Sequence, residues 1–271
     1  MQRFALCGNC SLLILLLTGQ GAFAQSSAPN SSPVPASNPQ AAALASQALA
    51  ALGTTPVSDV TLIGSVTRSV GPDVETGSFT LKAAGLAQSR MDLVFPSGTI
   101  TEVRTIANGI PAGFWQANGG TVRQIANHNL ASGAAWFFPL SMLSNRVQNP
   151  NSTITYVGQE VRSGRSVQHL HVVVQPSQGD SAGMAEHLTG QDFYLDSSSM
   201  LLVSLVYSEH PDNNALVDIP VELDFSDYRA ISGIALPFRI QKTFNGSLLL
   251  DITVQSAVLN SGLSNADFTA Q

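Results

Sequence analysis

The sequence predicts a mainly β protein, in which a strongly curved antiparallel sheet forms an unclosed half-barrel. An N-terminal helix and a mid-chain helical, apolar lid are expected on its concave side. The clearest evidence is the segment 219–258, where three runs alternate apolar and polar residues, as strands with one buried face do. Turn signals at Ser232-Gly233 and Asn245-Gly246 separate the runs, and Asn-Gly is a strong hairpin signal. We therefore expect an antiparallel meander here.

The first part of the chain, 1–24, has the pattern of a secretory signal peptide: a short basic start, an apolar run at 11–17 and a small-x-small site ending at Ala24. The run is shorter than the roughly 20 residues that span a bilayer, so we expect cleavage near Ala24 and no stable transmembrane anchor. A retained anchor is the alternative. Cys7 and Cys10 precede the run, whereas a lipobox cysteine would follow it. A periplasmic or secreted protein is predicted.

Composition sets the domain organisation and excludes several partners. Residues 25–40 are rich in Ser, Pro and Asn and predict a disordered linker, which leaves 41–271 as a single β domain. Only 11% of the residues are charged, the formal net charge is −6, and no basic block occurs. These properties argue against nucleic acid as a partner. No G-x-G-x-x-G, P-loop or G-x-S-x-G motif is present, and no cofactor or catalytic residue is predicted.

The order of elements follows from changes in hydrophobic period. Asn38 and Pro39 are suitable as the cap and first residue of a helix that includes Ala41 to Leu52 and ends at Gly53. From Val57 onward the period changes to two. The strands expected before the meander occupy 57–67, 77–87, 90–95, 99–107, 113–118, 153–161, 167–174, 192–196 and 201–207.

The most apolar and aromatic part of the domain surrounds Trp136. The spacing of Trp136, Leu140 and Leu143 suits a helix, which Pro139 would begin or kink. We expect this segment to cover the concave face of the sheet as a lid. The alternative is that its aromatic side chains are ordinary core that fills the half-barrel. A further short helix is expected at 182–189.

Three local motifs occur along the domain: Gly113-Phe-Trp115 with Asn118-Gly119, Phe193-Tyr-Leu-Asp196 with Leu201-Leu202, and Phe225-Ser-Asp-Tyr228 with Gly233-Ile-Ala-Leu-Pro237. Together they resemble motifs of the LolA/LolB-type envelope lipoprotein carriers and related outer-membrane lipoprotein-sorting proteins. The resemblance extends over most of 41–268. It departs at Asn118, where Asp is commoner, and after Leu202, where a proline is expected, so it indicates a distant relative and not an orthologue.

The resemblance implies an unclosed barrel whose cavity holds acyl chains or another apolar ligand. The residues predicted to line this cavity and its lid are Trp115, Trp136, Phe137, Phe138, Leu140, Leu143, Phe225, Phe238, Ile240 and Leu250. The apolar positions of the meander would form one wall: Val221, Leu223, Phe225, Phe238, Ile240, Leu248, Leu250, Ile252 and Val254.

Histidines provide the only metal-like pattern. Residues two apart on a strand point to one side, so His169 and His171 are weak candidates for a metal site, with His128, His187 or Glu160 as further ligands. The simpler interpretation is that both histidines are solvated or partly buried, and no metal is predicted.

The sequence thus predicts an exported bacterial envelope protein, non-enzymatic, that binds or carries an apolar ligand such as a lipid or a lipoprotein acyl chain. A partner protein of the envelope is possible. The alternative is a structural or protein-interaction scaffold whose core is filled by its own side chains. A third hypothesis is a hydrolase or metal-binding protein that uses His169 and His171 or the carboxylates of Glu222 and Asp224, which share one strand face.

Overall fold

The computed structural model describes residues 38–108, 110–130, 132, 134–175 and 182–269. The predicted signal peptide and nearly all of the predicted linker lie outside the described residues. The described residues belong to one unit, 34–271. Among the helices they form, none has the length and apolar character needed to cross a membrane.

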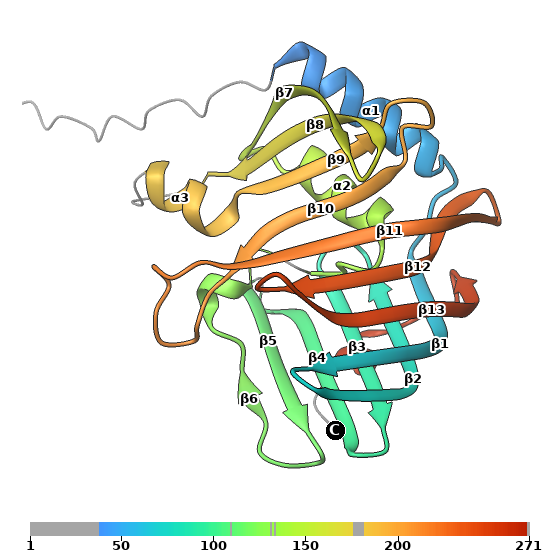
Figure 1. Cartoon of the computed structure of the whole chain (residues 1–271), viewed down its shortest axis with the longest axis vertical. Coiled ribbons are helices and arrows are strands. Elements are labelled where there is room, and N and C mark those ends of the chain that lie inside the picture. Colours follow the sequence, from blue (N-terminus) through green and yellow to red (C-terminus); the bar gives the residue numbers. More distant parts are fainter. Residues whose placement is uncertain (1–37, 109, 131, 133, 176–181, 270–271) are drawn as a thin grey trace, which may run out of the picture. The chain divides into compact units, whose positions relative to one another are not determined.

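The described chain contains three α-helices, two short 3₁₀ helices and thirteen strands (Figure 1). The helices are α1 (Pro39–Leu52), α2 (Pro139–Gln148), α3 (Ala182–Thr189), η1 (Asn127–Asn129) and η2 (Asn265–Phe268). The strands are β1 (Asp59–Val70), β2 (Asp73–Ala84), β3 (Gln88–Phe95), β4 (Gly98–Ala107), β5 (Ile110–Ala117), β6 (Arg123–Gln124), β7 (Ser152–Arg162), β8 (Arg165–Val174), β9 (Gln191–Asp196), β10 (Leu202–Glu209), β11 (Ile219–Ile231), β12 (Ile234–Phe244) and β13 (Ser247–Leu259).

All thirteen strands form one antiparallel sheet in the order β6-β5-β4-β3-β2-β1-β13-β12-β11-β10-β9-β8-β7. Strands β6 and β7 are the two edges, so the sheet is not closed. The predicted fold class, an unclosed half-barrel of antiparallel strands with an N-terminal helix, is confirmed. The sequence pattern missed β6, which has two residues and therefore no readable period.

The C-terminal meander forms β11, β12 and β13, with both predicted turns in place. Ser232 and Gly233 have φ of 50° and 83°, and Asn245 and Gly246 have φ of 49° and 76°. Positive φ at both central residues is the geometry of a two-residue hairpin turn, which Asn and Gly tolerate well.

One residue of the predicted wall faces the other way. Leu248 is 40% exposed, whereas Leu249 packs against the core. The register shifts between Lys242 and Thr243: Lys242 pairs with Leu250, but Thr243 pairs with Leu248. The β-bulge adds one residue to β13 and reverses the faces on its two sides, so the prediction for Leu248 was wrong.

Helix α1 begins and ends where the sequence predicts. The Asn38 side chain accepts a hydrogen bond from the backbone N–H of Gln40 (2.8 Å), and Gly53 follows the last turn. The helix buries three alanines and Leu52, and it packs against α2, β7, β8 and β12. Small side chains on this face allow the helix to lie close to the sheet and to α2 (Figure 1).

The predicted lid is only partly helical. Helix α2 begins at Pro139, and Trp136 and Phe137 lie in the turn before it. A proline disfavours helical geometry in the preceding residue, and Phe138 has φ −123° and ψ 87°. The helix therefore cannot extend back to Trp136, and the predicted helical spacing of Trp136 and Leu140 was wrong. Pro139 begins the helix and does not kink it, which agrees with the first of the two predicted alternatives.

The C-terminal segment covers part of the outer face of the sheet. Phe268 of η2 is buried against Val103 and Phe114. Lys82 forms an ion pair with Asp267 (2.8 Å), which holds η2 on this face. The β2–β5 part of the sheet is therefore packed on both sides, which makes it a firm support for the residues described next.

Candidate functional site

The ten residues predicted to line the ligand cavity lie mostly inside the main hydrophobic core. Eight of them are buried: Trp136, Phe137, Phe138, Leu143, Phe225, Phe238, Ile240 and Leu250. Leu140 is partly buried against the same core. Trp115 is half-buried on β5, beneath the guanidinium of Arg123 at 5.2 Å. The concave face is thus occupied by the protein's own side chains, and each fully buried large apolar side chain contributes about 2 kcal/mol to stability.

A cavity of about 320 Å³ lies beside this core, where the two margins of the open sheet approach each other. This volume is at the low end of the roughly 300–1,000 Å³ typical of small-molecule sites. Its walls come from β4–β5 near one margin, β8–β9 near the other, and α2 between them. Representative lining residues are Ile106, Ala112, Met142, Arg146, Val174 and Gln191. None of the ten predicted residues is among the described residues that line it.

Two guanidinium groups project among the apolar groups of the cavity wall. Arg104 donates hydrogen bonds from Nε to Glu102 (2.8 Å) and from Nη1 to the carbonyl oxygens of Asn129 (2.6 Å) and Ser132 (2.8 Å). Burial opposes its charge, but Glu102 outweighs this and raises the pKa of Arg104. Arg146 donates from Nε to the side-chain oxygen of Gln191 (2.7 Å). Burial lowers the pKa of Arg146 to about 10, so both groups stay cationic at neutral pH.

A buried ion pair lies under the apolar segment that precedes α2. Lys242 Nζ is 3.1 Å from Glu209 Oε1 and 5.4 Å from the ring centroid of Trp136. Burial favours the neutral amine, but Tyr207 and Glu209 outweigh it and raise the pKa of Lys242. Burial likewise favours a neutral carboxyl, yet Lys242 and Arg104 lower the pKa of Glu209. The pair is therefore ionised inside the concave face.

The weak metal candidates His169 and His171 do lie together on one face of β8. Both rings contact Asp192 Oδ1, from Nε2 of His169 and Nδ1 of His171, at 2.8 Å each. The remaining nitrogens face Glu160 (3.1 Å, His169) and Glu186 (2.8 Å, His171). The hydrogen bond that His171 donates to Asp192 is the main reason that the pKa of His171 is raised. Each ring thus lies between two carboxylates, which supply a partner to every ring nitrogen of the pair.

The predicted carboxylate pair also has structural partners. Glu222 forms an ion pair with Arg162, whose guanidinium lies 4.0 Å from the ring centroid of Tyr194. Burial and the nearby Glu222 raise the pKa of Asp224. This group lies on strands β7, β9 and β11 as part of a surface network, and it stays only a prediction as a catalytic pair.

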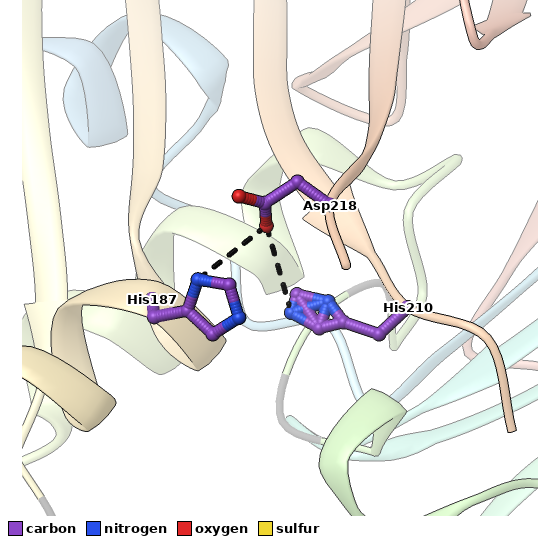
Figure 2. A group of neighbouring side chains, drawn as sticks. All are labelled: His187, His210 and Asp218. Atoms are coloured by element: carbon purple, nitrogen blue, oxygen red, sulfur yellow. Dashed lines mark ion pairs between the residues drawn. The ribbon is translucent and has the colours of Figure 1, made fainter. Parts of the chain in front are cut away.

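A second histidine group, which sequence reasoning did not assemble, consists of His187, His210 and Asp218 (Figure 2). Strand β10 ends at Glu209 and β11 begins at Ile219, and these two residues are paired. His210 and Asp218 are the first and last residues of the connecting loop, so they face each other. His187 comes from the last turn of α3. Asp218 Oδ1 is 3.6 Å from His187 Nδ1 and 3.9 Å from His210 Nε2. One possible ligand atom from each residue lies within 4.8 Å of the other two.

His210 is the unusual member of this group. Its side chain is 1% exposed, and neither ring nitrogen has a hydrogen-bond partner among the described residues. Burial, and then the neighbouring rings of His187 and His128, lower the pKa of His210. Its imidazole is therefore neutral at neutral pH, with one nitrogen lone pair and one N–H unsatisfied. A buried polar side chain without partners costs about 1–3 kcal/mol, which calls for an explanation.

The three rings of His128, His210 and His187 stack in a row, with centroids 5.9 Å and 4.8 Å apart. Nε2 of His187 lies 2.6 Å from the carbonyl oxygen of Ala215, and Nε2 of His128 lies 3.1 Å from that of Pro211. A carbonyl oxygen only accepts, so each Nε2 carries the proton and donates it. The β10–β11 loop is thereby fastened to α3 and to η1.

Asn129 joins this loop to the margin of the cavity. Its Nδ2 donates to the carbonyl oxygen of His210 (2.7 Å), and the backbone N–H of His210 donates to Asn129 Oδ1 (2.9 Å). The next residue, Leu130, lines the cavity. The histidine group and the cavity therefore share one loop, although no residue of the group lines the cavity.

The fold now defines the class of protein: an open half-barrel of antiparallel strands with a filled concave face and a small cavity at its margin. Among solved structures, this chain is similar to an outer membrane lipoprotein-sorting protein domain from Vibrio parahaemolyticus, with a TM-score of 0.56 and 12% identity over 84% of this chain and 96% of that one. It is also similar to a DUF1329 family protein from Desulfovibrio piger (TM-score 0.52, 17% identity, 85% and 96% covered).

A LolA superfamily protein from Nitrosomonas europaea is similar as well, with a TM-score of 0.50 and 8% identity over 85% of this chain and 97% of that one. The chain therefore has the LolA-type fold, and the predicted distant relationship is confirmed at the level of the fold. No family model matches the sequence, and no curated protein matches it.

Proposed function

We propose that this chain is a non-catalytic envelope protein that binds the apolar part of an amphiphile, such as a lipid or a lipoprotein acyl chain, at the margin of the half-barrel. The observation that carries the proposal is the cavity between α2 and the two margins of the sheet, which has mainly apolar walls. The LolA-type fold supports it, since two of the similar structures are named for lipoprotein sorting or for LolA.

The cavity wall also indicates which amphiphile fits. Arg104 and Arg146 place two positive charges beside Ile106 and Met142. An acyl chain would lie against the apolar groups, and an anionic or hydrogen-bond-accepting head would contact a guanidinium. A neutral, purely hydrocarbon ligand would place only apolar groups beside these two positive charges. We therefore propose an acidic amphiphile over a neutral one.

The predicted lid keeps a role in this proposal. Helix α2 places Leu143 in the core and Met142 and Arg146 at the cavity. A chain too long for about 320 Å³ would enter only if α2 and the preceding Trp136–Phe138 segment moved from the concave face. The ten predicted cavity residues would then contact ligand in that open state. Export to the periplasm or beyond, inferred from 1–24, is part of the same proposal.

The test is binding of a fluorescent fatty acid, with native mass spectrometry of the gently purified protein as a second readout. Val174→Phe places a ring in the cavity, since Val174 lines it and lies on the face of β8 that buries Leu170 and Val172. It is expected to weaken binding at least about tenfold, because it removes the volume that the acyl chain needs. Val161→Phe is the matched control, since Val161 is exposed on β7. Arg146→Gln is expected to weaken a fatty acid more than its methyl ester.

A protein-interaction scaffold is the second candidate function. It is favoured by the burial of Trp136, Phe137 and Phe138, which fill the concave face at 1–4% exposure. Fatty-acid binding and native mass spectrometry distinguish the carrier from the scaffold. A protein free of bound lipid that also fails to bind fatty acid would contradict the carrier and leave the scaffold. Equal loss in Val174→Phe and Val161→Phe would place the ligand elsewhere.

A further inference from the structure

We propose that His187, His210 and Asp218 form a binding site for a divalent transition-metal ion of the zinc type. The site lies where α3 meets the β10–β11 loop (Figure 2). It is separate from the lipid cavity and from the pair His169 and His171. Metal binding at this site does not depend on whether the cavity binds lipid.

The donor set fits such an ion. Two imidazole nitrogens and one carboxylate oxygen are borderline and hard ligands that zinc accepts, and three protein ligands leave one position for water. In a tetrahedral site with bonds of about 2.0–2.1 Å, the ligand atoms lie about 3.3 Å apart. Asp218 Oδ1 is already 3.6 Å from His187 and 3.9 Å from His210. Small side-chain movements would complete the geometry.

The second observation is the unsatisfied ring of His210. It is 1% exposed, and its Nε2 points toward the carboxylate of Asp218 from 3.9 Å, which is beyond hydrogen-bond range (Figure 2). A core position usually accepts an imidazole only when its nitrogens are satisfied. Coordination would use a nitrogen of this ring and would give the buried position its missing partner.

His187 is held in the form that a metal requires. Its Nε2 donates to the carbonyl oxygen of Ala215 (2.6 Å), so in the neutral ring the lone pair is on Nδ1, which faces Asp218. Metal-bound histidines commonly make this second hydrogen bond to a backbone carbonyl. Nδ1 of His187 and the carboxylate oxygen of Asp218 face each other at 3.6 Å, and a cation between them would contact both.

The surroundings favour a cation and allow it to enter. His187 lies in the last turn of α3, where the helix dipole favours positive charge. Asp218 is 51% exposed, so an ion reaches the carboxylate from solvent before it meets the buried His210. Metal binding would join α3 to both ends of the β10–β11 loop.

The experiment is zinc titration of the full chain, prepared without a polyhistidine tag and stripped with a chelator. Cys7→Ser and Cys10→Ser are included as a common background, because thiols in the predicted signal peptide would bind zinc. A chromophoric chelator competes for zinc, and the absorption spectrum of the cobalt complex reports tetrahedral nitrogen and oxygen ligation. We expect one zinc per chain.

Three variants locate the ion. Asp218→Asn changes a half-exposed residue and is expected to weaken zinc binding at least about tenfold, and His187→Gln about a hundredfold, because each removes a direct ligand. His169→Gln is the control and is expected to bind zinc as the parent does. Circular dichroism checks that each variant is folded. Absence of stoichiometric binding by the parent, or loss in His169→Gln with retention in His187→Gln, would overturn the proposal.

Discussion

Two histidine groups lie on either side of helix α3, and they differ in how their ring nitrogens are satisfied. His171 contacts Glu186 of this helix, and the next residue, His187, contacts Asp218. Around His169 and His171, three carboxylates supply a partner to all four ring nitrogens. Around His187 and His210, Asp218 is the only carboxylate within 4 Å among the described residues.

The difference lies in the partners of the ring nitrogens, which the spacing of histidines along the sequence does not reveal. His169 and His171 have the regular spacing, but carboxylates already supply a partner to each of their ring nitrogens. His187 and His210 have no motif, yet burial keeps His210 neutral and a carbonyl fixes the tautomer of His187. A metal ion needs an imidazole lone pair, and the hydrogen-bond partners of each ring decide on which nitrogen it lies.

Zinc should produce the largest effect that distinguishes the two groups. An ion that binds only the folded chain stabilises it by about 2.7 kcal/mol when its free concentration is a hundred times Kd. We expect zinc to raise the midpoint of thermal unfolding of the parent and of His169→Gln. In Asp218→Asn the stabilisation by zinc should be smaller by at least about 1.3 kcal/mol, because its affinity is expected to be at least about tenfold lower. Equal shifts in all three proteins would remove the proposed distinction between the groups.

Loss of the shared carboxylate should be the next largest effect, and it concerns the first group. Asp192→Asn leaves His169 and His171 without the charged acceptor that both contact, so we expect a loss of about 1–3 kcal/mol in the free energy of unfolding. Urea denaturation at pH 6 measures it. Asp212→Asn, at an exposed position of the β10–β11 loop, is the matched control and should change stability by less than about 0.5 kcal/mol. Similar values for both variants would contradict the prediction.

A leucine in place of histidine should have opposite effects in the two groups. In metal-free protein, His210→Leu removes two unsatisfied buried nitrogens and is expected to be neutral or to stabilise by up to about 1 kcal/mol. His169→Leu removes a partner of Asp192 and Glu160 and is expected to destabilise. Chemical denaturation in the presence of a chelator compares them. A large loss in His210→Leu would mean that this ring is already satisfied without metal.

The sheet was predictable because its information is local. Period two and the turn residues at Ser232-Gly233 and Asn245-Gly246 are enough to place β11, β12 and β13. The error at Leu248 has a non-local cause, since the bulge depends on how β13 pairs with Lys242 and Thr243 of β12. The same pair of strands contains a second exception to the alternating pattern. Lys242 is buried at a position where the alternation predicts an apolar residue.

The sites were harder to predict because their residues meet only in the folded sheet. Lys242 is stable inside because Glu209, on a different strand, pairs with it. His210 and Asp218 become neighbours only through the register that pairs Glu209 with Ile219. That register was the one available signal, since residues that flank a hairpin loop at equal distance face each other. Nothing in the sequence links them to His187, which arrives on a separate helix.

The smallest expected effect is a pH dependence confined to the first group. The hydrogen bond that His171 donates to Asp192 raises the pKa of His171 above its ordinary value of 6.5. Its contribution to stability is therefore complete below about pH 6.5 and is lost as the pH rises through the higher pKa of the folded state. We expect the difference in free energy of unfolding between the parent and His171→Gln to be largest at pH 6 and smaller at pH 8.5.

Solvent screening should keep this difference below about 1 kcal/mol, because the His171 ring is only partly buried. Metal-free protein is used, so that the His187 group adds no pH-dependent metal binding. The parent and His171→Gln both contain the other four histidines, so the titration of these residues cancels in the difference between the two free energies of unfolding. A difference that grows toward high pH would mean that His171 is neutral in the folded state, and that its lone pair is as available to a metal ion as that of His210.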